Sequence, residues 1–404
     1  MGERRAVGPV PDDGVRVLFL CHTARPGGAE LALLRMARRM TSGSVEVLFA
    51  EDGPMVEAFG RTAVPVTVLT GLGRGRGARG LGAWAALRGV VDLIRFGGPV
   101  TAWARGRSID VVVARSVKSM IYGAVVARRL GVPLVWSVHD RISADYLGRP
   151  AALVVRFVGR VLPAAYIVNS RATGATVSTG GKPTLVAPPA LDPRPGPVRS
   201  PEASPVRRVV MVGRISPWKG QDVFLRAFGR VFGGTHVEAV VVGGALFGEQ
   251  DYERELHRIA LAGPATGQVR FTGHVEDVRP HVAGAQVLVH ASVVPEPFGL
   301  VVSEGMAEGC AVVATTPGGP AEVVTDGVDG LLVPCGDEDA LVAALERLRT
   351  EPELLDALRA AAPAAIARYD VDVLLATLEP WLRAVAQGAR LPQSTSAWPA
   401  GDPR

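Results

Sequence analysis

Two glutamates eight residues apart frame a segment whose sequence favours a tight turn followed by a helix. The segment is EPFGLVVSE, from Glu296 to Glu304. Proline and glycine at positions 297 and 299 predict a turn, and the helix then begins near Leu300. Free N–H groups at a helix start attract phosphate or sugar oxygens, and carboxylates accept hydrogen bonds from vicinal hydroxyls. The pair therefore indicates a site for a ribose and a hexose, although a helix cap and an exposed helix residue would explain each glutamate alone.

Two cations lie upstream, where an apolar run ends. In VGRISPWKGQD, Arg214 follows the predicted strand 208–212, and Lys219 comes five residues later beside a glycine. Ligands of open α/β sheets bind at the carboxyl ends of the strands. A guanidinium fork and an ammonium point charge neutralise a diphosphate well. The spacing indicates a diphosphate site, and a solvated turn is the alternative for this pair taken alone.

Apolar runs that alternate with helical patterns place these residues on an α/β fold. In the first half the runs cover residues 15–20, 45–50, 64–69, 111–114, 134–138 and 166–169. In the second half they cover residues 208–212, 237–242, 269–272, 287–290, 311–314 and 330–333. This alternation predicts right-handed βαβ units and a parallel doubly wound sheet in each half. A further helix is expected over residues 340–349.

A proline- and serine-rich segment over residues 187–205 separates the two halves. It lacks periodicity, which is typical of an interdomain linker. We expect an N-terminal Rossmann-like domain over 1–190 and a C-terminal one over 206–370, with a central cleft between them. Residues 371–387 are expected to form a helix that packs back toward the N-terminal domain, and residues 388–404 a flexible tail.

The separated motifs together closely resemble glycosyltransferase family 4, whose members are retaining enzymes of the GT-B type. The resemblance rests on EPFGLVVSE, on the GR…KG segment and on a later GG.AEVV…DG segment, and it is densest from Val209 to Val333. It implies an α/β GT-B fold in which two Rossmann-like parallel-sheet domains face a central cleft. The first domain would bind the acceptor and the second the nucleotide sugar. Departures are modest, with Gly305 where the family usually has alanine and Cys310 where proline is common.

The resemblance implies a role for each matching residue of the second half. Arg214 and Lys219 would bind the donor diphosphate and stabilise it as it leaves. Glu296 would contact the donor hexose, and Glu304 would hold the ribose hydroxyls. The resemblance implies further donor-binding positions after the first strand of this half, in the 273–275 turn and beside Glu296. They are Gly213, Val275, Phe298, Gly299 and Leu300.

Two segments of the first half also match the family pattern. Gly27 and Gly28 follow the first strand and open a helix, the position of the family's glycine loop near the donor phosphates. A helix start favours an anion by about 0.3–1 kcal/mol. His139, in WSVHD at a strand end, matches a histidine that faces the donor sugar, and a satisfied loop histidine is the alternative.

The resemblance implies transfer of a hexosyl group from a nucleotide-diphosphate sugar, with a UDP-sugar favoured, to an acceptor hydroxyl with retention of configuration. The acceptor stays open among glycolipids, polysaccharide precursors and natural-product scaffolds. No Asp-x-Asp lies in a donor-site loop, and Asp370 and Asp372 are interpreted as a helix cap. We therefore expect no catalytic metal and no cofactor besides the nucleotide-sugar co-substrate. The alternatives are a nucleotide-sugar epimerase, a phosphorylase, and a nucleotide-sugar-binding module that has lost its chemistry.

Charge is unevenly distributed along the chain. Residues 1–195 carry 26 Lys and Arg against 13 Asp and Glu, a net of +13, and the remainder carries 18 against 26, a net of −8. A basic half suits a phospholipid surface, a phosphate-bearing acceptor or nucleic acid, and a coding bias toward arginine is the alternative. No recognised motif supports nucleic acid, so we expect none to bind.

Residues 71–107 concentrate this basic character. They contain seven arginines, one acidic residue and interleaved aromatic and aliphatic side chains. Such a segment can lie at the periphery of an anionic membrane, or it can be an acceptor-side helix packed on the domain core.

The N-terminus lacks an apolar signal region, and arginines interrupt the longest apolar stretches. We therefore expect a cytoplasmic protein, and peripheral contact of residues 71–107 with the inner face of the membrane stays open beside the packed-helix alternative.

Overall fold

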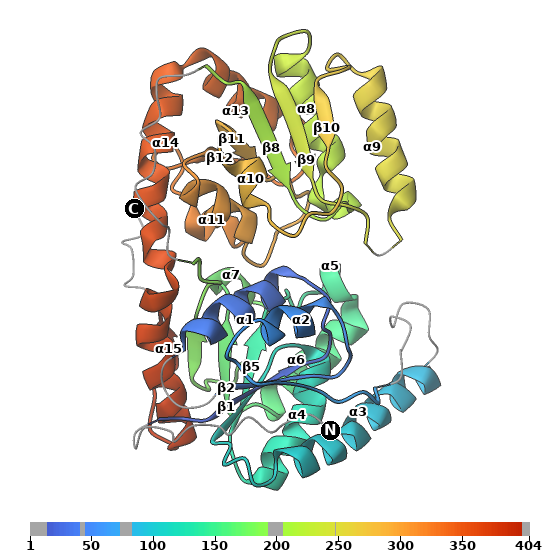
Figure 1. Ribbon diagram of the computed structural model, residues 1–404, viewed down its shortest axis with the longest axis vertical. Helices are drawn as coiled ribbons and strands as arrows, with labels where there is room; N and C mark the ends of the chain where they lie inside the picture. Colours follow the sequence, from blue (N-terminus) through green and yellow to red (C-terminus); the bar gives the residue numbers. More distant parts are fainter. Residues whose placement is uncertain (1–13, 41–44, 73–82, 193–204, 247, 398–404) are drawn as a thin grey trace. The chain divides into compact units, whose positions relative to one another are not determined.

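The computed structural model describes residues 14–40, 45–72, 83–192, 205–246 and 248–397. The chain forms two compact units, one of Met1–Asp192 together with Tyr369–Arg404 and the other of Pro193–Arg368. Each unit is built on a parallel β-sheet with packed helices (Figure 1). This architecture confirms the predicted α/β class with two parallel-sheet domains.

The sheet of the first unit has eight strands within the described residues. They are β1 (Val17–Cys21), β2 (Val45–Phe49), β3 (Val66–Val68), β4 (Val111–Ala114), β5 (Leu134–Val138), β6 (Ala165–Val168), β7 (Thr184–Val186) and β14 (Ser394–Ser396). Their order is β14-β7-β6-β5-β4-β1-β2-β3. Val17 of β1 lies beside Val45 of β2 and beside Val111 of β4. The central strands are buried along their whole length, which explains why they are continuous apolar runs rather than alternating ones.

The described part of the first unit contains eight α-helices. They are α1 (Gly28–Arg39), α2 (Pro54–Gly60), α3 (Ala83–Ala104), α4 (Val117–Leu130), α5 (Ala144–Leu147), α6 (Arg149–Val161), α7 (Arg171–Gly174) and α15 (Val371–Ala386). Helix α15 packs on α1, and Arg39 pairs with Asp372 at 2.7 Å. Asp370 caps α15 as predicted, because its carboxylate accepts the Asp372 N–H at 2.8 Å. None of the helices described is both long enough and apolar enough to cross a membrane.

Two parts of the predicted linker and tail belong to the first unit instead. Leu191 forms a parallel bridge with Asp370, so residues 187–192 pack with this unit, while residues 193–204 lie outside the described part of the chain. The prediction of a flexible tail from Gly388 onward is wrong for residues 394–396. They form β14, which pairs in parallel with β7 and places Ser394 beside Thr184. Main-chain hydrogen bonds to an open sheet edge order this segment although its side chains are small and polar.

The second unit has a six-stranded sheet within the residues described. Its strands are β8 (Arg208–Val212), β9 (Glu238–Val242), β10 (Val269–Phe271), β11 (Val287–Val289), β12 (Ala311–Thr316) and β13 (Leu331–Pro334). Their order is β10-β9-β8-β11-β12-β13, with all neighbours parallel. The strand order reverses between β8 and β11. Ligands of open α/β sheets bind at such a reversal, outside the carboxyl ends of the strands.

The helices described in the second unit cover both faces of this sheet. They are α8 (Gln221–Phe232), α9 (Gln250–Ala262), α10 (Arg279–Val282), α11 (Leu300–Ala307), α12 (Pro320–Val323), α13 (Glu338–Thr350) and α14 (Pro352–Ile366). Single 3₁₀ turns lie at Pro217–Lys219 and Ala367–Tyr369. Phe224 and Phe228 of α8 pack into the apolar core against the strands. Helix α11 begins at Leu300, as the turn chemistry of the preceding segment predicts.

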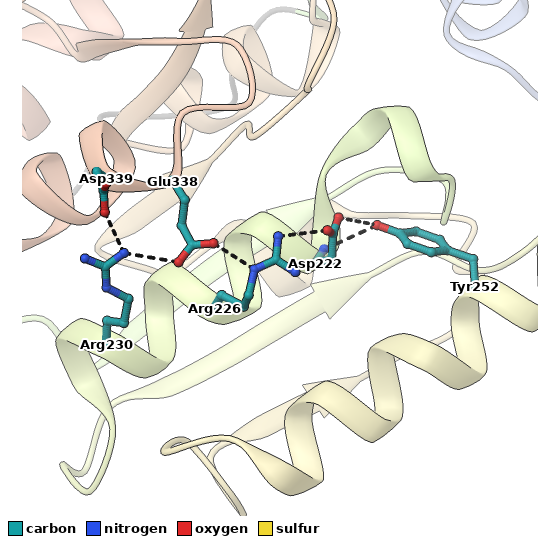
Figure 2. A network of polar contacts seen from close by, with 6 residues as sticks. All are labelled: Asp222, Arg226, Arg230, Tyr252, Glu338 and Asp339. Carbon is teal, nitrogen blue, oxygen red and sulfur yellow. Dashed lines mark hydrogen bonds and ion pairs between the residues drawn. The ribbon is translucent and has the colours of Figure 1, made fainter.

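A network of polar side chains joins α8 to α13 and α9 (Figure 2). Arg226 of α8 donates to Asp222 of the same helix at 2.9 Å and to Glu338 of α13 at 2.7 Å. Arg230 also donates to Glu338, and the Tyr252 hydroxyl of α9 donates to Asp222 at 2.7 Å. Exposed ion pairs each contribute about 0.2–1 kcal/mol. The network therefore serves mainly to orient α8, whose first residue follows the turn that carries the predicted cations.

Candidate functional site

The turn after β8 carries Lys219 and is fixed to the segment that follows β11. Lys219 ends the 3₁₀ turn, and Gly220 then adopts a left-handed conformation with φ +73°. A Cβ on Gly220 would lie 2.1 Å from the carbonyl oxygen of Ala291. The Val293 N–H donates to the Trp218 carbonyl at 3.0 Å. Only glycine therefore allows the two segments to approach closely enough to set the position of Lys219.

Gly220→Ala is expected to lower the free energy of unfolding by about 1–3 kcal/mol and to displace the turn, because the new methyl group meets backbone that cannot move away. Gly234→Ala is the matched control, because Gly234 also has φ +73° and no atom lies within 4 Å of its added Cβ. Urea unfolding measures the free energy of unfolding of both variants. Gly234→Ala reports the cost of the left-handed conformation alone, and any additional loss in Gly220→Ala reports the clash with the Ala291 carbonyl. Equal losses in the two variants would contradict this account of the turn.

Glu296 lies in the loop between β11 and α11, and its carboxylate is buried against Lys219. Its backbone carbonyl accepts the Gly319 N–H at 2.9 Å, which fixes the loop, and the residue is 5% exposed. Lys219 Nζ lies 2.6 Å from Glu296 Oε1 and 4.4 Å from the centre of the Trp218 ring. Burial alone would raise the pKa of Glu296, but Lys219 and His290 outweigh it and hold that pKa well below its usual range. The structure thus joins two of the predicted catalytic residues as a buried ion pair.

Two buried polar residues beneath Glu296 were not predicted from the sequence. His290 Nε2 lies 2.9 Å from Glu296 Oε1, and the Ser292 hydroxyl donates to the same oxygen. The Thr315 N–H donates to His290 Nδ1 at 3.4 Å, and the Nε2 edge of the ring faces the carboxylate. The one signal in the sequence is a pair of polar residues inside the apolar segment VLVHASVVP. These contacts fix the carboxylate that in turn fixes Lys219.

Arg214 lies at the same sheet edge but pairs with a different carboxylate. Its NH1 lies 2.6 Å from Oε1 of Glu249, the N-cap residue of α9, and 28% of the Arg214 side chain is exposed. The Arg214 carbonyl accepts the Gln221 amide at 2.9 Å, which ties the strand end to the start of α8. Glu249 gave no sequence signal because 35 residues separate it from Arg214. Both predicted cations are thus balanced by carboxylates in this structure.

The residues after Glu296 form the start of α11. Phe298 is buried, and Gly299 caps the helix in a left-handed conformation with φ +80°. A Cβ on Gly299 would lie 2.8 Å from a ring carbon of Pro320, so the turn packs tightly on α12. Leu300 is the first residue of α11, and Glu304 lies one turn further along, partly exposed. The structure thus places these predicted residues on one continuous turn and helix start.

Glycines line the carboxyl ends of three neighbouring strands. Gly213 follows β8, and its N–H donates to the carbonyl of Val242 at 2.9 Å. Gly243 and Gly273, after β9 and β10, form a bridge with an N–O distance of 3.0 Å. Val275 lies two residues beyond, partly exposed. Backbone without side chains at this edge lets a planar ligand approach the main chain closely.

The first unit carries the other predicted residues at the carboxyl edge of its own sheet. Gly27 is the N-cap of α1, and a Cβ on it would lie 2.6 Å from Oε2 of Glu30. Gly28 is the first residue of that helix. His139 follows β5, and its Nε2 lies 2.9 Å from the Ser137 hydroxyl. Their role in donor binding stays a prediction.

Arg115, at the end of β4, is an unpredicted residue between these two segments. Its NH2 donates to the Ala29 carbonyl at 2.6 Å. With Ser137 and His139 it lines a cavity of about 30 Å³, which has room for about one water molecule. Burial, followed by the charge of Arg115, holds the pKa of His139 well below its usual range. The imidazole is therefore neutral at neutral pH.

Comparison with known proteins gives matches over both units. The model described as "Glycosyltransferase Family 4" matches residues 26–194, and the one described as "Glycosyl transferases group 1" matches residues 206–351. A lipopolysaccharide core biosynthesis glycosyltransferase, LpsE of Rhizobium meliloti, is 33% identical over 38% of this chain and 42% of its own length. A D-inositol 3-phosphate glycosyltransferase of Streptomyces griseus is 30% identical over 66% of each chain. The chain thus spans about two fifths to two thirds of the length of these curated relatives.

Solved structures match nearly the whole length of the chain. Anabaena HepE in complex with UDP and glucose is 26% identical to this chain, covers 92% of it over 100% of its own length, and has a TM-score of 0.76. A sucrose-phosphate synthase of Thermosynechococcus elongatus, 18% identical with a TM-score of 0.73 over 93% of this chain and all of its own, shares the fold.

Proposed function

Because the chain belongs to glycosyltransferase family 4 and has the two-domain GT-B fold, we propose that it transfers a sugar from a nucleotide diphosphate to an acceptor hydroxyl. The observation that carries this proposal is the buried pair of Lys219 and Glu296, 2.6 Å apart, beside the strand reversal of the second sheet. The proposed donor is a UDP-hexose. Anabaena HepE, which contains UDP and glucose in its crystal structure, supports this choice of donor.

The proposed chemistry retains the anomeric configuration. The acceptor oxygen bonds to the anomeric carbon on the face from which the diphosphate departs, and the bond between that carbon and the phosphate oxygen breaks. The leaving diphosphate takes the electron pair of that bond and the acceptor's proton. Lys219 and Arg214 stabilise the charge that develops on the diphosphate, which is why we propose that no divalent metal is needed. Glu296 fixes the Lys219 ammonium, and its carboxylate accepts a hydrogen bond from a hydroxyl of the hexose.

Donor binding in this scheme requires Arg214 to exchange its carboxylate partner for the diphosphate. Glu249→Gln is therefore expected to raise the affinity for UDP by about two- to fivefold, since partly exposed ion pairs are worth about 0.2–1 kcal/mol. Titration calorimetry measures this change. Asp251→Asn is the matched control, because Asp251 lies on the same helix and 89% of its side chain is exposed. Unchanged or weaker UDP binding by Glu249→Gln would contradict the proposed exchange.

The acceptor is proposed to carry a phosphate. The net charge of +13 over residues 1–195 favours an anionic acceptor. Two relatives are named for the mannosylation of phosphatidyl-myo-inositol and for the glycosylation of D-inositol 3-phosphate, which agrees with this choice. Glycolipids, polysaccharide precursors and natural-product scaffolds that contain a phosphate all fall within the proposed class.

A donor panel tests the function as a whole. The chain is incubated with UDP-, GDP-, ADP- and TDP-hexoses in the presence of EDTA, with and without phosphorylated acceptors, and release of the nucleotide diphosphate is measured. We expect UDP release that an acceptor accelerates, with product NMR showing the donor's anomeric configuration. Conversion of the sugar nucleotide without an acceptor would indicate an epimerase. Dependence on inorganic phosphate would indicate a phosphorylase, and no turnover with any donor would indicate a binding module.

A further inference from the structure

Helix α6 of the first unit presents a row of large apolar side chains to solvent. Leu153, Phe157 and Val161 are spaced four residues apart, so they lie along one side of the helix, and Val154 extends the same face. They are 66%, 69%, 58% and 61% exposed, respectively. Single exposed apolar residues are ordinary, whereas a contiguous row of four marks an interaction surface. We call these four residues the α6 face.

The opposite side of α6 is firmly packed. Gly159 faces the Trp136 ring so closely that a Cβ on it would lie 2.5 Å from the ring. The Arg156 Nε donates to the carbonyls of Ile142 at 2.9 Å and Thr176 at 3.1 Å. Ala152 is buried on the same side. The helix is therefore fixed in rotation, and its apolar row cannot turn inward to escape water.

The charges around the α6 face are positive. The helix sequence RPAALVVRFVGRV contains three arginines and no acidic residue. Arg149 precedes Leu153 by four residues and so lies in the same row, while Arg160 flanks it, and both are exposed. Lys182 donates to the carbonyls of Arg160 and Pro163, at 2.6 Å each, at the C-terminal end of α6. The face therefore combines a strip of apolar side chains with a cationic border.

We propose that the α6 face binds the surface of a membrane that contains anionic phospholipids. Apolar side chains would enter the boundary between head groups and acyl chains, and the arginines would contact lipid phosphates. The net charge of +13 over residues 1–195 adds attraction to the same surface. Helix α5, which packs on α6, carries the acidic Asp145, and this residue pairs with Arg141 at 3.0 Å. The exposed charges on α6 itself are arginines, which favour an anionic lipid surface over a neutral apolar patch of a protein partner. This proposal concerns binding and does not depend on the proposed transfer reaction.

Helix α3, in the basic segment predicted to contact membrane, is the rival surface. Leu87, Val90 and Ile94 are 53%, 40% and 48% exposed, which is less than the α6 face, and the acidic Asp92 is exposed among them. Residues 73–82, which hold several of the arginines of that segment, lie outside the described part of the chain. The larger exposure and the uniform charge favour α6.

Co-sedimentation of the full chain with vesicles tests the proposal. Vesicles of phosphatidylcholine with phosphatidylglycerol are compared with vesicles of phosphatidylcholine alone, and we expect binding to the anionic ones. The Leu153→Ser/Phe157→Ser variant is expected to bind at least about tenfold more weakly, since full burial of each such side chain is worth about that factor or more. Arg149→Gln/Arg160→Gln should weaken binding by about tenfold or more on anionic vesicles. Leu261→Ser in α9, where Leu261 is 72% exposed, is the matched control and should bind like the unmodified chain.

Three results would overturn the proposal. One is undiminished vesicle binding by both α6 variants. Another is loss of binding in Leu87→Ser/Ile94→Ser with full binding retained by the α6 variants, which would assign the contact to α3. The third is a dimer of the unmodified chain in light scattering that Phe157→Ser dissociates, with no binding to vesicles, which would make a second copy the partner. Thermal unfolding of each variant is measured alongside, and the arginine variant provides the test if the serine variant does not fold.

Discussion

Lys219→Ala is expected to lower turnover by about 30-fold to several thousand-fold at saturating donor. Losing one member of a desolvated charge pair costs about 2–5 kcal/mol, and each 1.36 kcal/mol changes a rate tenfold. The Lys219 side chain is only 16% exposed and lies 2.6 Å from Glu296, so water cannot replace its charge effectively. Steady-state release of the nucleotide diphosphate measures the effect.

Arg230→Ala is the control for the loss of a positive charge elsewhere in the same unit, because Arg230 lies in the last turn of α8, away from the Lys219 turn. Arg230 lies on α8, its side chain is 48% exposed, and its partners are on α13 (Figure 2). This variant should keep nearly normal turnover.

The Lys219→Ala/Glu296→Gln double variant should lose less activity than the sum of the single losses, because the two residues act as a pair. Near-normal turnover by Lys219→Ala would remove the basis for its assigned role.

Glu296→Gln is expected to lower kcat/KM by about 10- to 150-fold. Glutamine has the same shape, but its neutral oxygen holds the Lys219 ammonium less strongly, and hydrogen bonds to charged groups are worth about 1.5–3 kcal/mol. The variant separates loss of charge from loss of volume. If its kcat/KM matches that of the unmodified enzyme, the carboxylate has no part in the reaction.

The same variant has a second signature in the dependence of stability on pH. The pKa of Glu296 is held below its ordinary value of 4.5 in the folded chain, so the folded state favours the ionised form. Its contribution to stability is complete above about pH 4.5 and is lost as the pH falls toward the lower folded pKa. Glu296→Gln should therefore flatten the acid side of a plot of Tm against pH. An unchanged acid side would contradict the lowered pKa.

Most of the fold follows from local sequence patterns. The strand β8 matches its apolar run at both ends, and α11 begins at the leucine that follows the Pro-Phe-Gly turn. The unpredicted β14 and β7 are three residues each, and β14 consists of serine and threonine, so hydrophobic periodicity gives no signal for it. What orders β14 is an open strand edge more than 200 residues earlier in the chain.

The candidate site, like the fold, could be predicted from the sequence only in part. The sequence indicates Lys219 and Glu296 as candidates because each lies at a turn whose glycine and proline pattern predicts the end of a strand or the start of a helix, and the family resemblance then implies their roles. Their contact could not be predicted, because 77 residues separate them. Glu249 and Arg115 could not be predicted from the sequence, because their contacts form only when folding brings strand ends together. His290 follows an apolar run, so the sequence predicts it as part of a buried strand. Local patterns thus locate the loops, whereas the ion pairs depend on tertiary packing.

Titration calorimetry of UDP against the unmodified chain and Lys219→Ala, both in EDTA, tests whether Lys219 binds the donor diphosphate. The unmodified chain should bind UDP without a divalent metal, and the variant should bind it at least about tenfold more weakly, since tenfold corresponds to 1.4 kcal/mol. Equal UDP affinity in the two proteins, or binding that appears only with magnesium, would contradict the assignment of Lys219 to the donor diphosphate.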